Sequence, residues 1–294
     1  MEMINKRGYL KEDFRLFHIR DQVELELGYH YHEFDKIVVF LTGNVTYVVE
    51  GKAYFLKPWD ILLVPHNQIH RPIIDPSEPY ERIILWVNAD YLRDHCLGGD
   101  DLRQCFTMAE EKSFSLIRPE NADRVTLMKQ LNTVESAMGA QEFGHELLSH
   151  TTFLQFMIEL NRIALKDHTA MVKEAFRSDP KLEEIIAYVN ANLEKDLSLE
   201  SIARQFYMSK SYLMHKFKEM TGYSAHKYIQ QKRLIQAAEL IRDGVPALRL
   251  WRLLRFPPRL QEAVRGESKR YKLKGTERTV PFIGGYKLQT LSSA

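Results

Sequence analysis

Residues 198–221, SLESIARQFYMSKSYLMHKFKEMT, are the stretch that most constrains the fold of this chain. Serine, a favourable helix N-cap, occurs at position 198 and again at position 209, after a break in the apolar pattern. Apolar residues follow each serine at helical spacing: Leu199, Ile202 and Ala203 in the first segment, then Leu213, Phe217 and Met220 in the second. Two short helices that are each buried on one side are typical of a helix-turn-helix that binds DNA. A plain helical hairpin has the same pattern, so the periodicity alone leaves both interpretations open.

The second of these predicted helices has basic and polar side chains away from its apolar stripe. Its first turn and its exposed side are where side chains reach base edges, and lysines further along are better placed for phosphates. The candidate residues for DNA binding are Ser209, Lys210, Tyr212, His215, Lys216 and Lys218, with Lys227 and Lys232 as further phosphate contacts.

The residues between 182 and 240 strongly resemble the first half of the DNA-binding domain of AraC/XylS-type transcription regulators. The matching features stand at fixed spacing: Ile202-Ala203, Ser209, Tyr212-Leu213, Phe217-Lys218, Thr221-Gly222, Tyr228, Arg233-Leu234, Ala237 and Leu240. The resemblance implies a sequence-specific regulator whose partner is promoter DNA, and not an enzyme.

Residues 14–90 show the pattern of short β-strands. Val45, Tyr47 and Val49 alternate with more polar residues after a turn at Gly43, and residues 50–52 predict the turn that reverses the chain. Further strands are predicted at residues 37–42 (IVVFLT), 60–65 (DILLVP) and 82–87 (RIILWV). Short strands at this spacing favour a small barrel or jelly roll.

Residues 28–73 resemble the cupin-type sensor domain that precedes many AraC-type helix-turn-helix domains. The counterparts are the His30-x-His32 pair, Gly43, the Gly51 turn, Pro58-x-Asp60, and Pro65 followed by His70. The resemblance implies a barrel that encloses a small-molecule effector, commonly a sugar or another metabolite. The candidate effector-binding residues are His30, His32, Tyr47, His70, Arg71 and Trp86, and Trp59 is a further candidate for the chamber. Aromatic side chains of a small barrel also serve simply as its core.

The three histidines leave a metal-dependent cupin enzyme open as an alternative. Imidazoles that converge inside a barrel are a plausible site for iron, manganese or another first-row metal. Metal-binding cupins, however, usually place a glutamate four or five residues after the second histidine, where this chain has Lys36 and Ile37. An inward-facing Lys36 would oppose a divalent cation. We therefore expect no metal and no cofactor, and expect these histidines to hydrogen-bond an effector or to serve structural roles.

Helical periodicity begins near residue 121, after a stretch between about 92 and 120 that is expected to be polar and irregular. In the second helical segment, residues 141–165, an apolar stripe has heptad-like spacing: Leu147, Leu154, Ile158 and Leu165. In the resembled family such helices often form a homodimer. Packing back onto the barrel would create the same stripe, so the pattern supports either role.

The predicted fold class is α+β multidomain, with an N-terminal cupin-like β-barrel (jelly roll) and following helices, then an all-α helix-turn-helix domain. Residues 1–165 are the expected effector-sensing and dimerisation domain, 166–179 the linker, and 180–247 the first helix-turn-helix unit with its connecting helix. Asp179 is expected to cap the first of these helices and Pro180 to open it.

Residues 248–294 depart from the family, which has a second helix-turn-helix there. This chain has instead a basic sequence with Pro257-Pro258, which would break a recognition helix. The hypothesis is an aberrant tail from a shifted reading frame, and the competing hypothesis is a diverged basic tail that contacts phosphates. A remnant regulator that no longer binds DNA is a further alternative.

The charge of the chain is unevenly distributed. Residues 181–294 hold 21 Lys and Arg against 11 Asp and Glu, a net charge of +10, whereas residues 1–180 have a net charge of −8. This asymmetry indicates a nucleic-acid partner for the second half, although residues 241–294 alone supply +8 of it.

The composition and the N-terminal sequence indicate the cellular compartment of the protein. A chain of 294 residues with 45% hydrophobic and 27% charged residues is typical of two soluble domains. Cys96 and Cys105 do not make a disulfide framework. The N-terminal residues are too polar for a signal peptide, and no apolar run approaches the ~18 residues of a spanning helix. We therefore expect a cytoplasmic protein without a membrane partner.

Overall fold

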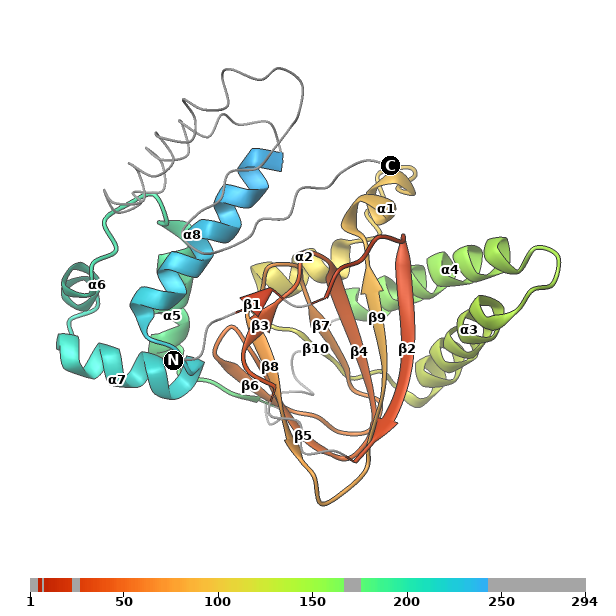
Figure 1. Ribbon diagram of the computed structural model, residues 1–294, viewed down its shortest axis with the longest axis horizontal. Coiled ribbons are helices and arrows are strands. Elements are labelled where there is room, and N and C mark those ends of the chain that lie inside the picture. Colours follow the sequence, from red (N-terminus) through yellow and green to blue (C-terminus); the bar gives the residue numbers. More distant parts are fainter. Residues whose placement is uncertain (1–4, 7, 23–26, 167–175, 243–294) are drawn as a thin grey trace, which may run out of the picture. The chain divides into compact units, whose positions relative to one another are not determined.

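The computed structural model describes residues 5–6, 8–22, 27–166 and 176–242 (Figure 1). The described residues form two compact units, one of those up to residue 184 together with 216–222, and the other of residues 185–215 and 223–242. No helix in the described ranges is long and apolar enough to cross a membrane.

Two sheets form the barrel that the N-terminal sequence predicts. The first sheet has the order β1 (Asn5–Lys6), β3 (His30–Tyr31), β8 (His70–Asp75), β5 (Asn44–Val49), β6 (Lys52–Phe55) and β11 (Phe176–Arg177). The second has the order β10 (Leu116–Ile117), β7 (Ile61–Val64), β4 (Asp35–Thr42), β9 (Tyr80–Val87) and β2 (Phe14–Asp21). All pairings are antiparallel except β1 with β3. The two sheets confirm the β part of the predicted α+β fold class.

Strand β4 lies at the centre of the second sheet and is buried on both faces. Ile37 and Val39 belong to a core between this sheet and the helices, which we call the outer core. Val38 and Phe40 belong to a core between the two sheets, which we call the interior core. Side chains of a strand alternate between its faces, so a strand buried on both sides has the continuous apolar run found at residues 37–41.

Four helices contribute to the outer core: α1 (Ala89–Asp94), α2 (Gln104–Glu111), α3 (Asn121–Gly139) and α4 (His145–Leu165). Helices α3 and α4 lie on the side of strands β2 and β9 (Figure 1). The side chains of α4 in this core are Phe153, Phe156, Met157, Leu160 and Ile163. Phe153 stacks on Phe14 of β2, with ring centroids 4.1 Å apart.

The expectation that residues 92–120 are irregular is wrong for α2 and β10. Cys105, expected in a polar stretch, is buried in α2 together with Phe106. Backbone groups at the start of α2 are hydrogen-bonded by a side chain of another helix, α4. The Asn161 side chain accepts a hydrogen bond from the Cys105 backbone N–H (2.6 Å) and donates one to the Leu102 carbonyl (2.8 Å). This contact joins residues far apart in the sequence, so no local pattern predicts it.

Two sequence motifs of the barrel have clear structural reasons. Glu50 and Gly51 form the two-residue turn between β5 and β6, and their φ angles of 47° and 79° are those of a hairpin turn that matches strand twist. Asp60 of the Pro-x-Asp motif is fully buried, and its two carboxylate oxygens each accept a hydrogen bond of 2.7 Å from Arg118.

The helices after residue 179 are α5 (Pro180–Ala191), α6 (Leu199–Gln205), α7 (Lys210–Thr221) and α8 (Ala225–Arg242). The caps predicted at Asp179, Ser198 and Ser209 are confirmed: they accept hydrogen bonds from the backbone N–H groups of Lys181 (2.9 Å), Ser201 (3.1 Å) and Tyr212 (3.1 Å) respectively. Ser224 caps α8 in the same way, with a hydrogen bond of 3.3 Å from the Lys227 N–H. Helices α6 and α7 are therefore the two helices predicted from the opening sequence stretch.

Several predicted segments lie wholly or partly outside the described residues. The tail 248–294 is outside them entirely, as are residues 167–175 of the expected linker and 243–247 at the end of the expected DNA-binding domain. The last part of that linker is described, and there Phe176 and Arg177 form β11 against β6.

Candidate effector site and DNA interface

Three histidines meet inside the barrel, and we call them the histidine cluster: His30, His32 and His70. Strand pairing places His30 of β3 opposite His70 of β8. Their exposed fractions are 5%, 4% and 0%, and one nitrogen of each ring lies within 4.8 Å of the others. The ring centroids are 4.4–5.0 Å apart. The convergence that the sequence left open is thus present in the fold.

Backbone carbonyls orient two of these rings. His30 Nδ1 and His70 Nδ1 each donate a hydrogen bond of 2.9 Å, to the carbonyls of Gly28 and Gln68 respectively. A neutral imidazole that donates through Nδ1 presents an unprotonated Nε2. Nε2 of His70 is buried and has no hydrogen-bond partner among the residues that the structure describes.

His70 is held in the neutral form. Burial, followed by the positive charge of Lys36 and the neighbouring rings of His30 and His32, keeps its pKa well below the ordinary histidine value. The ring therefore remains a lone-pair donor at neutral pH.

Lys36 and Tyr47 complete the polar surroundings of the cluster. Lys36 is 7% exposed, and its ammonium donates a hydrogen bond of 2.9 Å to the Tyr47 hydroxyl. The Tyr47 ring is stacked relative to His70 with centroids 6.0 Å apart. Lys36 lies on the same face of β4 as Val38 and Phe40, so it faces between the sheets. Sequence reasoning treated Lys36 only as an obstacle to a cation, and the alternation of β4 is the signal that identifies it as a site residue.

The remaining candidate effector-binding residues do not all lie on the inner faces of the two sheets. Trp86 of β9 is paired with Lys36 of β4, and Phe34 lies between it and His32, at centroid distances of 4.5 Å and 4.6 Å. Arg71 follows His70 directly in β8 and so lies on the opposite face, with its guanidinium 4.4 Å from the Tyr29 ring centroid. The structure therefore gathers His30, His32, Tyr47, His70 and Trp86, but not Arg71; Trp59 packs against the outer core.

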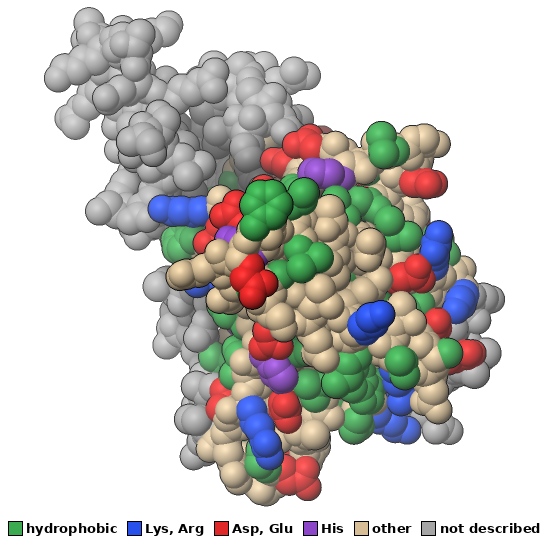
Figure 2. Space-filling view, turned by 90° about the vertical axis from the view of Figure 1, so that its right-hand side faces the viewer, with side chains coloured by type: hydrophobic (Ala, Val, Ile, Leu, Met, Phe, Trp, Pro, Cys, Tyr) green, Lys and Arg blue, Asp and Glu red, His purple; other side chains and the backbone are tan. Residues whose placement is uncertain are grey.

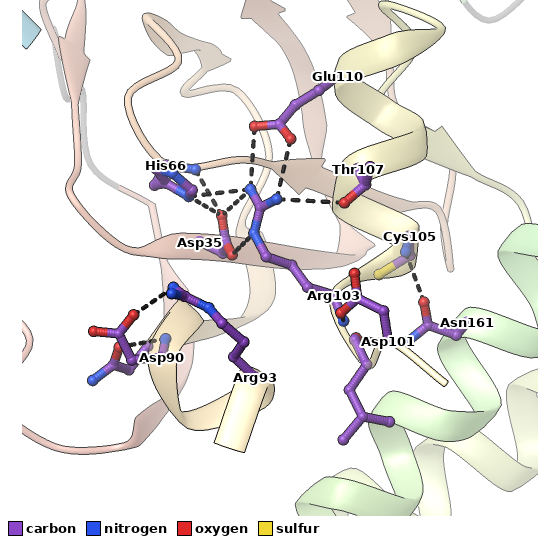
Figure 3. Close-up of polar contacts among 12 residues, drawn as sticks. Asp35, His66, Asp90, Arg93, Asp101, Arg103, Cys105, Thr107, Glu110 and Asn161 are labelled. Carbon is purple, nitrogen blue, oxygen red and sulfur yellow. Dashed lines mark hydrogen bonds and ion pairs between the residues drawn. The ribbon is translucent and has the colours of Figure 1, made fainter. Parts of the chain in front are cut away.

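A buried carboxylate on the other face of β4 fixes the orientation of this strand (Figure 3). Asp35 has no exposed surface, and its Oδ1 accepts hydrogen bonds from the backbone N–H (2.8 Å) and ring Nδ1 (2.9 Å) of His66. Arg103 Nε donates to Asp35 Oδ2 at 2.8 Å, and the same guanidinium contacts Glu110 of α2. The network ties β4, the residue after Pro65, and α2 together.

Charge in this network shifts two pKa values in opposite directions. Burial alone would raise the pKa of Asp35, but the hydrogen bonds and charges of His66 and Arg103 outweigh burial and lower it. Burial alone would lower the pKa of His66, but Asp35 outweighs burial and raises it, against a smaller opposing effect of Arg103 and with support from Glu110. His66 and Asp35 are therefore an ion pair at mildly acidic pH.

The candidate DNA-binding residues lie on and beside α7. Tyr212, His215 and Lys218 have exposed side chains, and Tyr212 is 55% exposed. Three others have partners within the chain: the Ser209 hydroxyl caps α7, Lys210 contacts Glu200, and the Lys216 ammonium lies 3.0 Å from Asp179. Sequence reasoning did not select Tyr207, which is 96% exposed with a φ of 54° in the turn between α6 and α7, or Met214, which is 46% exposed. The break in helical pattern at residues 206–208 was the available signal for Tyr207.

Comparison with known proteins identifies both parts of the chain. Residues 17–157 match the family of the AraC-like ligand binding domain, and residues 190–230 match the bacterial regulatory helix-turn-helix proteins of the AraC family. The transcriptional activator RhaS of Klebsiella pneumoniae is 22% identical over 223 residues, which cover 73% of this chain and 74% of the relative. RhaS of Salmonella schwarzengrund is 23% identical with the same coverage. A crystal structure of ToxT from Vibrio cholerae matches with 14% identity, 88% and 94% coverage and a TM-score of 0.37.

A ligand-binding barrel followed by a helix-turn-helix defines this chain as a transcription regulator that responds to a small molecule, and not an enzyme. The two family matches together span more than half of the sequence, and the chain belongs to the AraC family of regulators.

The ion pair of His66 predicts a pH-dependent stability. A histidine whose pKa is raised by folding stabilises the fold fully below its unfolded pKa of about 6.5, and this contribution is lost as the pH rises through the raised folded pKa. We expect His66→Gln to reduce the free energy of unfolding more at about pH 5.5 than at about pH 8.5, as measured by urea denaturation of the full-length chain. An equal reduction at both pH values would contradict the ion pair.

Proposed function

We propose that the histidine cluster and its neighbours are the effector site of this regulator. The observation that carries the proposal is a group of polar side chains placed together inside a barrel that is otherwise apolar. Burying polar groups costs free energy unless they are satisfied, and pockets for small molecules combine apolar walls with a few convergent polar groups.

Each residue has a role in this proposal. His30, His32, His70 and Tyr47 form the polar wall of the effector site, and Lys36 attracts negative or polar oxygen atoms of the effector. Trp86 provides an aromatic wall, on which a sugar ring or another flat face can stack. Arg71 has a peripheral role through Tyr29 and does not contact the effector.

We propose that α7 reads promoter DNA. Tyr212 and His215 are assigned to base edges and Lys218 to phosphates, because these side chains are exposed on one helix and point away from its buried stripe. Ser209 contributes as the cap that places the first turn. Lys210 and Lys216 reach DNA only after exchanging Glu200 and Asp179 for phosphate or base oxygens, which are chemically similar partners.

The proposed organisation keeps residues 1–165 as the sensor, 166–179 as the linker and 180–247 as the DNA-binding domain of a cytoplasmic protein. The tail 248–294 replaces the second helix-turn-helix of the family and adds positive charge without reading bases. Effector binding then changes DNA affinity through a coupling free energy between the two sites.

We also propose a homodimer formed through α4. The outer core uses one face of this helix, and the heptad-like stripe lies largely on another: Leu147, Ile158 and Leu165 are 70%, 39% and 58% exposed. Leu154 packs against the outer core, so packing onto the barrel accounts for this one member of the stripe and not for the other three. A groove nearby is lined by further exposed apolar side chains of α3 and the α3–α4 connection, including Val125, Met128 and Phe143. Figure 2 shows hydrophobic side chains exposed among charged ones on this side of the molecule. A second copy of the chain buries them and supplies a second α7 for the adjacent half-site.

Substitutions in α7 test the proposed DNA interface. The probe is a DNA fragment that the wild-type chain selects from its source genome. Tyr212→Ala is expected to cost about 1–3 kcal/mol of binding free energy and to blur sequence preference, because it removes a base contact. Lys218→Ala is expected to weaken binding to all sequences and to reduce the salt slope by about 1. Fluorescence anisotropy at several salt concentrations measures both.

The control is Lys112→Ala, which removes an exposed lysine from the barrel part of the chain and is expected to leave affinity unchanged. Equal, purely salt-dependent losses for all three variants would contradict base reading by α7.

Charge placed on the α4 stripe tests the homodimer. The full-length chain is expected to sediment as a dimer, and Leu147→Glu with Ile158→Glu as a monomer, because two carboxylates per chain cannot be buried in an apolar interface without partners. Leu97→Glu, at a residue that is 82% exposed outside the stripe, is the matched control and remains dimeric. A monomeric wild type, or a double variant that stays dimeric, would contradict the proposal.

A further inference from the structure

The histidine cluster has the donor chemistry of a transition-metal site. Imidazole nitrogen is a preferred ligand of zinc, copper, nickel and iron. Histidines that bind metals usually donate their second ring N–H to a carbonyl or carboxylate, which fixes the tautomer and aims the other nitrogen. His30 and His70 do so here, through Nδ1 and the carbonyls of Gly28 and Gln68 at 2.9 Å.

The geometry of the three donors is close to that of a bound state. The ligand-capable nitrogens lie within 4.8 Å of one another. Nitrogen ligands at about 2.1 Å in a tetrahedral shell are about 3.4 Å apart, so ring movements of about an ångström close the site. The buried Nε2 of His70, which has no hydrogen-bond partner among the described residues, would gain a partner by this movement.

Lys36 determines what completes the shell. An ammonium beside three neutral imidazoles disfavours a bare divalent cation, but it attracts an anionic oxygen that bridges the metal and Lys36. Its hydrogen bond to the Tyr47 hydroxyl, at 2.9 Å, keeps the ammonium beside the cluster.

We infer that His30, His32 and His70 bind one divalent transition-metal ion. The effector completes the coordination shell with an anionic oxygen that lies between the metal and Lys36. This inference rests on the proposed effector site and specifies its chemistry. Direct hydrogen bonding of a metal-free effector by the same histidines is the competing outcome of the test.

Cobalt(II) titration of the full-length chain, after chelator treatment and dialysis, tests the inference through the visible absorption of the bound ion and its amount by elemental analysis. We expect one Co(II) per chain, displaced by one Zn(II). His70→Gln and His32→Gln are expected to lose binding by at least a hundredfold, whereas His145→Gln, the matched histidine control on α4, retains it. Addition of acetate is expected to change the spectrum of the wild type but not of Lys36→Met.

Lys36→Glu is expected to increase the affinity for Co(II), a result that misfolding cannot produce. Replacing the ammonium by a carboxylate donor beside the three imidazoles is expected to tighten Co(II) binding by at least tenfold. Absence of stoichiometric binding, binding that survives His70→Gln in a folded chain, or a Lys36→Glu variant that binds no tighter would overturn the inference. DNA binding by the same preparations is scored separately, so a chain that binds its DNA fragment and no Co(II) overturns the metal assignment alone.

Discussion

Asp35, a carboxylate with no exposed surface, is the group on which the arrangement of the barrel depends. It accepts hydrogen bonds from His66 and Arg103, and these partners come from a turn and from the start of α2. Removing a charge from water costs several kcal/mol, and only charged partners of good geometry repay it. A shift of β4 by one residue would leave the carboxylate facing the interior core without them. Asp35 therefore locks the register in which Lys36 faces between the sheets.

That register places opposite chemistries on the two faces of one strand. The outer face has a satisfied ion network and an apolar core shared with four helices, and it is structural. The inner face has Lys36 beside three histidines, and it is where a ligand binds in our account. In our account the DNA-reading side chains belong to α7, whose N-cap Ser209 and buried Leu213 and Phe217 come from one short stretch of sequence. The sensor and the reader are thus built by different segments of the chain, as regulation of one by the other requires.

The helix-turn-helix was predictable from the sequence because its determinants are local. Ser198 and Ser209 cap their own helices, and buried Leu213 and Phe217 follow at helical spacing. Helix α2 was missed because its first N–H groups are satisfied by Asn161, more than fifty residues away. Strand β10 was missed because it consists of two residues that pair with β7. In the candidate site, the convergence of the histidines was foreseen only through a resemblance, whereas the alternation of His70 and Arg71 already excluded a common face for both. The role of Lys36 depended on knowing the register of β4.

Sequence-specific DNA binding by this chain is tested most directly by the selection of DNA from its source genome. Purified full-length chain is mixed with sheared genomic DNA and excess nonspecific competitor at two salt concentrations, and the retained fragments are sequenced. Our account predicts a small set of fragments that share a sequence motif and persist at the higher salt concentration, because base contacts survive when phosphate contacts weaken. Retention that follows only fragment length and disappears with salt would contradict it.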